Sequence, residues 1–205
     1  MSSLFVSATD TDVGKTYVSS LLVNQLKPRV ALRYWKPLGS GVPSDSDKIR
    51  ITCGPACVIE SVYEMAESLS PHLAAAHEGK KIECDLVIRK WRELANQSVV
   101  VEGAGGLLVP LSETALQIDL IKSLELPILL VTHDKVGAIN HTLLCLEACR
   151  ARKITVAAVV LNRYRGDLGN GESIQHFGKT RVISIYENGL FDSVTLDFLA
   201  EGFFL

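Results

Sequence analysis

The stretch that decides the fold is LFVSATDTDVGKTYVSSLL, residues 4–22. It opens with a mainly apolar run of five residues, which is typical of a strand buried on both faces of a sheet. A polar loop follows and ends in Gly14, Lys15 and Thr16, where a helical pattern, Thr16–Leu26, begins. Free backbone amides at a helix N-terminus bind anions. This order of strand, glycine loop and helix predicts a phosphate-binding loop; the alternative is an ordinary turn with a surface lysine.

The strict pattern for such a loop, G-x-x-x-x-G-K-[ST], requires glycine at position 9, where this chain has Thr9. A loop longer by one residue would place Ala8 at the position of the first glycine. Alanine is tolerated there if its φ is negative, because a Cβ atom is penalised mainly at positive φ. We therefore expect an ordinary backbone angle at Ala8. Lys15 would reach the β- and γ-phosphates, and the Thr16 hydroxyl would bind Mg²⁺.

The bulk composition excludes several classes of protein. The chain has 205 residues, 47% of them hydrophobic and 21% charged, with a net charge of −2. These values suit one globular domain over residues 1–205 and give no sign of binding to nucleic acid. No apolar run approaches the ~18 residues of a membrane span, and no secretory signal is evident. Together with an odd number of cysteines, five, this predicts the cytoplasm.

Strand-like apolar runs alternate with helical patterns along the whole chain. This alternation predicts an α/β fold of the P-loop NTPase type, with a mostly parallel sheet and helices on both faces. In such sheets, ligands bind at the carboxyl ends of the strands. The expected strands are Leu4–Ala8, Val30–Trp35, Ser98–Val101, Pro127–Thr132, Thr155–Leu161 and Val182–Ile185, and the expected helices are Thr16–Leu26, Val58–Leu69, Cys84–Ala95, Ala115–Leu124 and Ala138–Arg152.

Two acidic residues are candidate magnesium ligands. Glu102 follows the apolar run Val99–Val101 and precedes Gly-Ala-Gly-Gly, so its carboxylate would lie at the tip of a buried strand. Mg²⁺ prefers such oxygen donors. Asp47, in the segment SDSD, is the second candidate. The alternatives are a turn-capping role for Glu102 and a loop or helix-capping role for Asp47.

Further polar groups follow other expected strands. Lys36 precedes Pro37 at a strand end, where it is either a solvated lysine or enters the same cleft as Lys15. Two lysines in one cleft would require anions such as a γ-phosphate and a substrate carboxylate or carbamate. Ser40 adds a hydroxyl group in a glycine-flanked loop. Gly137–Asn140 begins a long helix, whose N-terminus either binds an anion or simply starts a packed helix. Asn162 would read an adenine edge or serve as a turn residue.

In order and spacing, these segments resemble the motifs of dethiobiotin synthetase. The similarity runs from residue 4 to about residue 163, and the last 40 or so residues match poorly. The lengthened phosphate loop and the Glu-Gly-Ala-Gly-Gly segment are its most specific parts. The segments are SATDTDVGKT (7–16), WKPLGSG (35–41), SPH (70–72) with HEG (77–79), VEGAGGLLVPL (101–111), GAINH (137–141) and VVLNR (159–163).

The resemblance implies an ATP- and Mg²⁺-dependent ligase of biotin synthesis. Such an enzyme closes a cyclic urea from 7,8-diaminononanoate and CO₂ through a carbamate and a carbamic-phosphoric anhydride, and releases ADP and phosphate. ATP is the co-substrate and Mg²⁺ the cofactor. The family is a homodimer with its active sites at the interface, so the N-terminus of one helix would bind the substrate carboxylate in the partner's site.

Site residues follow by position from the same resemblance. The catalytic set would be Lys15, Lys36 and Thr11. The metal ligands would be Thr16, Asp47 and Glu102. The nucleotide would contact Asp12, Val13, Gly14, Lys15, Thr16, Tyr17, Glu102, Gly105 and, at the adenine, Asn162. The substrate would contact Thr11, Asp12, Lys36, Ser40 and, from the partner, Gly137, Ala138, Ile139 and Asn140.

The chain departs from the family at two places. Asp12 stands where many relatives carry glutamate, and Tyr186 begins a segment without the proline usual beside the adenine, which leaves the choice of nucleotide open. The main alternative function is a partitioning-type ATPase that acts by nucleotide-gated dimerisation and partner binding. Those proteins carry a second lysine early in the loop, where this chain has Asp10, so the sequence favours the ligase.

Overall fold

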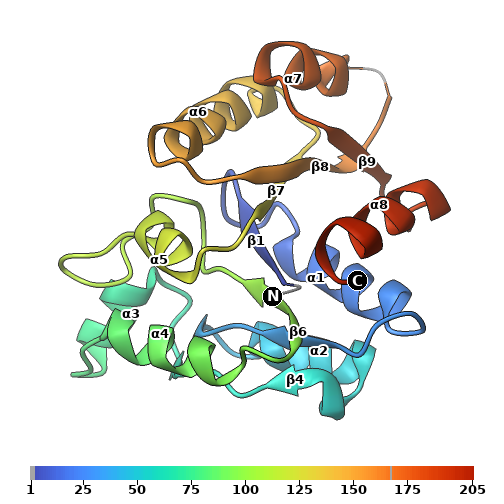
Figure 1. Ribbon diagram of the computed structural model, residues 1–205. Helices are drawn as coiled ribbons and strands as arrows, with labels where there is room; N and C mark the ends of the chain where they lie inside the picture. The colour runs from blue at the N-terminus through green and yellow to red at the C-terminus, as the bar shows by residue number, and fades with distance from the viewer. Residues whose placement is uncertain (1–2, 167) are drawn as a thin grey trace.

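The computed structural model describes residues 3–166 and 168–205 and contains a central seven-stranded sheet (Figure 1). Every strand pairing described in it is parallel, which confirms the predicted fold class. The spatial order is β4 (Val58–Ile59), β2 (Leu32–Trp35), β6 (Ser98–Glu102), β1 (Leu4–Ala8), β7 (Ile128–His133), β8 (Val156–Tyr164) and β9 (Val182–Tyr186).

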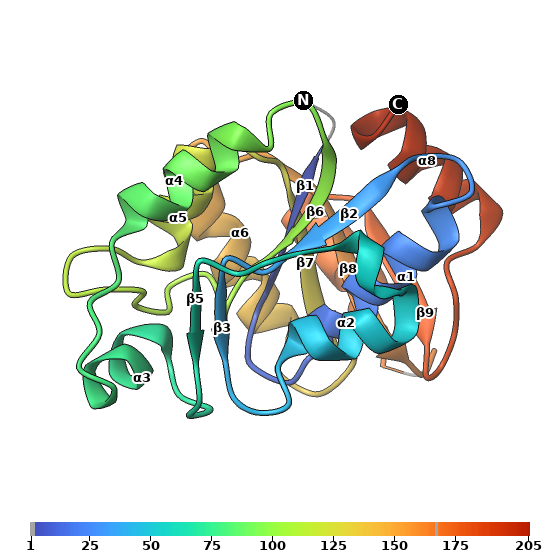
Figure 2. The same ribbon diagram turned by 90° about the horizontal axis from the view of Figure 1, so that it is seen from below.

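Helices cover both faces of this sheet, as the two views show (Figures 1 and 2). Side chains of alternating direction along β1 divide the core: Leu4 and Val6 belong to one cluster and Phe5 to the other. One face carries α1 (Lys15–Leu26), α2 (Asp45–Cys53) and α8 (Ser193–Phe203); the other carries α3 (Pro71–His77), α4 (Cys84–Glu93), α5 (Gln117–Leu124), α6 (Ala138–Ala151) and α7 (Asn170–Gly178).

The helix predicted over Val58–Leu69 is wrong. That segment forms β4, which pairs with β2 at the sheet edge, and β5 (Tyr63–Met65), which pairs with β3 (Leu38–Ser40) in a separate two-stranded sheet. The spacing of its apolar residues fits a helix locally, but pairing with exposed strand edges decides its conformation. The short helix η1 (Pro55–Cys57) leads into it. In the described residues no helix is long and apolar enough for a membrane span.

The backbone angle of Ala8, the last residue of β1, is ordinary. Its φ is not positive, which confirms the expectation from the sequence.

The central strands bring their carboxyl ends to one edge of the sheet. Register places Val6 of β1 beside Glu102 of β6, and Trp35 of β2 beside Val101. The residues that follow these strands therefore meet in one region, as a parallel sheet requires.

Candidate active site

The loop between β1 and α1 needs glycine at its end. Gly14 has a φ of 101°, and a Cβ atom there would lie 2.2 Å from Nδ2 of Asn162. Asn162 is buried and donates a hydrogen bond from that nitrogen to the carbonyl of Val13, at 2.9 Å. Asp12 also adopts a left-handed conformation, with a φ of 57°. These two left-handed residues, on either side of Val13, lead the loop into α1, whose first amides are free to form an anion site.

Glu102 is the centre of the polar cluster behind this loop. Its side chain is fully buried, and Oε1 accepts hydrogen bonds from Thr16 Oγ1 at 2.8 Å and from Lys36 Nζ at 3.1 Å. Its second oxygen, Oε2, accepts one from the Tyr34 hydroxyl at 3.2 Å. A buried charge needs such partners, because burial without them is costly. The structure thus brings the predicted residues Thr16, Lys36 and Glu102 together.

Lys36 also forms an ion pair with Asp45, so its ammonium group lies between two carboxylates. Burial alone would lower the pKa of Lys36, but the charges of Glu102 and Asp45 outweigh it and raise that pKa above its ordinary value. Burial would likewise raise the pKa of Asp45, but the charge of Lys36 lowers it to about 2. Both groups are therefore charged at neutral pH. Lys15 is nearly buried, and desolvation lowers its pKa.

Asp47 is not part of this cluster, which corrects its predicted place beside Thr16 and Glu102. Its carboxylate accepts hydrogen bonds from the Ser44 backbone and hydroxyl and pairs with Arg50. It closes a capping box at the start of α2, so the helix-capping alternative was the right one. Asp45, two residues earlier, contacts Lys36 instead. Sequence reasoning missed Asp45, although the spacing of Ser44 and Asp47 is a capping signature that would have placed α2.

A cavity of about 670 Å³ opens in front of the cluster. It is also lined by Asp45, and by Ser70 and Arg163 from the quoted segments SPH and VVLNR, to which no role was assigned from the sequence. The predicted site residues that line it are Thr11, Asp12, Gly14, Lys15, Thr16, Lys36, Ser40 and Gly105.

The other predicted residues lie around this cavity. Val13 and Asn162 support the loop from behind. The hydroxyl of Tyr17, on α1, donates a hydrogen bond to the carbonyl of Gly189 at 2.6 Å and so ties the segment after β9 to the phosphate loop. Gly137, with a φ of 93°, caps the N-terminus of α6, where Ala138, Ile139 and Asn140 form the first turn. These four residues lie outside the described lining of the cavity.

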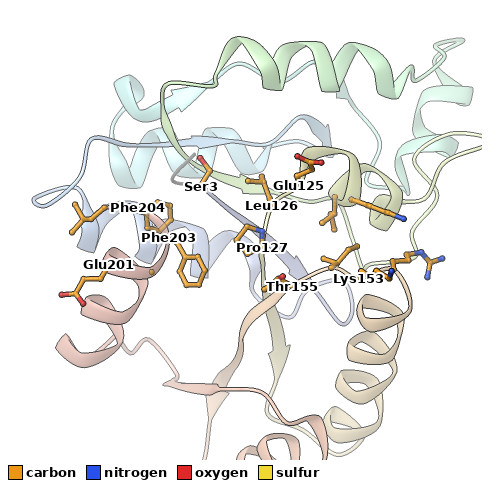
Figure 3. A pocket seen from close by; sticks show the side chains of 15 residues that line it. Ser3, Glu125, Leu126, Pro127, Lys153, Thr155, Glu201, Phe203 and Phe204 are labelled. Carbon is orange, nitrogen blue, oxygen red and sulfur yellow. The ribbon is translucent and has the colours of Figure 1, made fainter.

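A second cavity, of about 740 Å³, lies at the opposite end of the sheet (Figure 3). Ser3, Pro127 and Thr155 line it where they precede β1, β7 and β8, and Phe203 and Phe204 close it from the end of α8. The two cavities are similar in size, but ligands of parallel sheets bind at the carboxyl ends of the strands. The cavity at the phosphate loop is therefore the candidate active site.

The cluster provides the donor set that Mg²⁺ requires. Asp45 and Glu102 supply carboxylate oxygens and Thr16 a hydroxyl oxygen, and Mg²⁺ binds such donors while keeping several of its waters. The ammonium group of Lys36 already lies between the carboxylates of Asp45 and Glu102, so the space between these two carboxylates attracts a cation. The residues present fit the metal.

This fold and this loop define a P-loop NTPase, and solved structures of that class have the same chain path. A MinC:MinD cell division protein complex from Aquifex aeolicus matches with a TM-score of 0.62 and 13% identity, over 98% of this chain and 86% of that one. A ParA family ATPase from Chlorobium tepidum matches with a TM-score of 0.57 and 14% identity, over 99% and 91%. At such identities the likeness shows the fold alone.

Sequence comparison gives the family. A family model described as an AAA domain matches residues 2–188. An ATP-dependent dethiobiotin synthetase from Paramagnetospirillum magneticum is 38% identical over 90% of this chain and 87% of its own length, and one from Fusobacterium nucleatum is 42% identical over 90% and 91%. The chain belongs to the ATP-dependent dethiobiotin synthetase family.

Proposed function

We propose that this protein closes the ureido ring of dethiobiotin from 7,8-diaminononanoate, CO₂ and ATP. One amine of the substrate takes up CO₂ to form a carbamate, the γ-phosphoryl group of ATP is transferred to it, and the second amine displaces phosphate from the mixed anhydride. The observation that carries the proposal is the convergence of Lys15, Thr16 and Lys36 at one cavity, with the buried Glu102 bonded to Thr16 and Lys36 directly behind it, in a chain of this family.

Phosphoryl transfer is mainly a matter of positioning and of charge stabilisation. Lys15, at the start of α1, would hold the β- and γ-phosphates together with the amides of the loop. Lys36 would hold the carbamate and the transferring phosphoryl group, because its charged end already lies at the cavity wall next to Thr16. Neither role requires a nucleophilic side chain.

Mg²⁺ would be held by Thr16, Glu102 and Asp45, with Asp45 in place of the expected Asp47. When bound, the metal neutralises charge on the phosphate oxygens. Thr11, Asp12 and Ser40 line the part of the same cavity that would receive the diamine and its carbamate. The carboxylate of Asp12 would attract an amine of the substrate. The left-handed backbone conformation of Asp12 lets the phosphate loop turn where it lines the cavity.

The reaction itself gives the direct test. The purified protein with 7,8-diaminononanoate, bicarbonate and MgATP is expected to form dethiobiotin, ADP and phosphate in equal amounts, detected by mass spectrometry. Omission of the diamine should suppress ADP release. A partitioning-type ATPase would hydrolyse ATP without the diamine and respond to a protein or DNA partner instead, so that result would reject the ligase.

We further propose that two copies of the chain form the active unit. The groove between the loop after β6 and α6 has an apolar wall that includes Leu108 and Leu144, which are 52% and 60% exposed. Thr11 and Val109 line both this groove and the active-site cavity. A partner chain seated here would lie at the mouth of the cavity, where the N-terminus of its own α6 could receive the substrate carboxylate.

Leu144→Glu is expected to convert the dimer to a monomer, because it places a charge in an apolar interface. Sedimentation velocity would measure the change, and the KM for the diamine should rise as the partner's α6 is lost. The matched control is Val194→Glu, which also replaces an exposed apolar residue of a helix, 71% exposed on the other face of the sheet. A Leu144→Glu protein that remains a dimer would contradict the proposed interface.

A further inference from the structure

Tyr34 contacts the candidate metal ligand Glu102 from the side away from the cavity. Tyr34 lies on β2, and its side chain is fully buried among apolar residues of α1, β1 and β6. Its hydroxyl group donates to Glu102 Oε2 at 3.2 Å. A buried tyrosine hydroxyl usually has a partner, but this partner is a fully buried carboxylate rather than a backbone carbonyl.

The two oxygens of Glu102 thereby receive different partners. Oε1 accepts from Thr16 and Lys36, both of which line the cavity. Oε2 accepts from Tyr34, which belongs to the core. The carboxylate is thus fixed from both sides, and Oε1 is the oxygen bonded to the residues that line the cavity.

We propose that Tyr34 is a positioning residue that restricts Glu102 to binding the metal through one oxygen and so favours Mg²⁺ over Ca²⁺. Mg²⁺ requires a near-octahedral arrangement and takes one oxygen from each carboxylate, whereas Ca²⁺ accepts seven or eight ligands and often binds both oxygens of one carboxylate. This inference rests on the proposed function, since it requires that Glu102 bind the metal of MgATP.

Without the tyrosine hydroxyl, Oε2 has no described donor and is no longer held on the core side of the carboxylate. The side chain can then tilt so that both oxygens reach the metal, which suits Ca²⁺ and not Mg²⁺. Partners that orient a metal ligand in this way typically account for about 10- to 100-fold in metal affinity. Tyr34→Phe removes the hydroxyl group and keeps the ring that fills the core.

The test measures metal affinity by calorimetry on protein saturated with a non-hydrolysable ATP analogue. Tyr34→Phe is expected to weaken Mg²⁺ binding about 10- to 100-fold and Ca²⁺ binding much less. The affinity for the analogue in EDTA should stay the same, which a general loss of structure would not allow. The control is Tyr63→Phe, whose hydroxyl accepts from the Glu83 backbone at 3.0 Å and which should leave the ratio of the two metal affinities unchanged.

Two further measurements separate the possible failures. In the Glu102→Gln background, adding Tyr34→Phe should change nothing more, because the tyrosine acts through the carboxylate. An unchanged metal ratio in Tyr34→Phe would overturn the role of Tyr34 alone. If Glu102→Gln itself leaves Mg²⁺ affinity unchanged, the proposed metal role of Glu102 fails as well, whereas the proposed reaction is rejected only if no dethiobiotin forms. Wild-type protein that binds Ca²⁺ as tightly as Mg²⁺ would overturn the inference without any variant.

Discussion

Replacement of Lys36 by alanine is expected to lower kcat by about two decades or more. The ammonium group is proposed to hold the carbamate and the transferring phosphoryl group, and a hydrogen bond to a charged partner contributes about 1.5–3 kcal/mol, or about one to two decades in rate. Two such partners are involved. Single-turnover measurement of ADP formation at saturating MgATP and diamine would test this expectation.

The same substitution also affects the fold, because Lys36 is the ion-pair partner of the fully buried Glu102. Removing one member of a buried pair leaves an uncompensated charge and costs about 3–5 kcal/mol. We therefore expect a lower melting temperature, and the assay must be run well below it. From sequence alone, Lys36→Ala would be expected largely to spare the fold, but the burial of its partner changes that expectation.

Lys90→Ala is the matched control for Lys36→Ala. Lys90 pairs with Glu93 at 2.9 Å on α4, away from the cavity, and its side chain is 40% exposed. Exposed pairs contribute about 0–1 kcal/mol, so its loss should change neither kcat nor stability greatly. Lys36→Arg keeps the charge and tests its geometry, since a planar guanidinium does not replace a compact ammonium. A folded Lys36→Ala protein with near-normal kcat would remove Lys36 from the mechanism.

The sequence was sufficient for the central strands because they are buried on both faces. A continuous apolar run such as Leu4–Val6, Val99–Val101 or Leu129–Val131 has no polar side that would permit another environment. Those strands fix where Gly14, Lys36 and Glu102 emerge, so the main parts of the site follow from them. The resemblance to a known family then supplied the roles, which spacing alone would have left open.

The strands of the segment Val58–Leu69, one of them at an edge of the central sheet, were not predictable in the same way. Val58–Leu69 has a helix-like spacing of apolar residues, and its strands form only because β2 and β3 offer unpaired edges. The polar helix α2 has a weak apolar pattern, and its capping box is the sequence feature that indicates where it begins. The contact of Tyr34 was not predictable either. An aromatic residue in a strand usually belongs to the core, and nothing in the sequence shows that its hydroxyl donates to Glu102.

The second large effect concerns the two aspartates at the start of α2. Asp45→Asn is expected to weaken Mg²⁺ affinity and lower kcat by about one to two decades each, because it removes a charge from the proposed metal site. Asp47→Asn should change neither. Asp47 caps the helix and pairs with Arg50 at the surface, so its loss is expected to reduce the melting temperature slightly. Metal titration with the ATP analogue and steady-state kinetics would compare the two variants.

Acid stability gives these aspartates an independent check. The pKa of Asp45 falls from an ordinary 3.8 to about 2 in the folded chain. Its contribution to stability is therefore complete above pH 3.8 and is lost as the pH falls through about 2. Asp45→Asn should be less stable at neutral pH and should lose part of the acid dependence between these values. If Asp47→Asn instead abolished Mg²⁺ binding while Asp45→Asn did not, α2 would have to present its third residue to the cavity, and the metal site proposed here would be wrong.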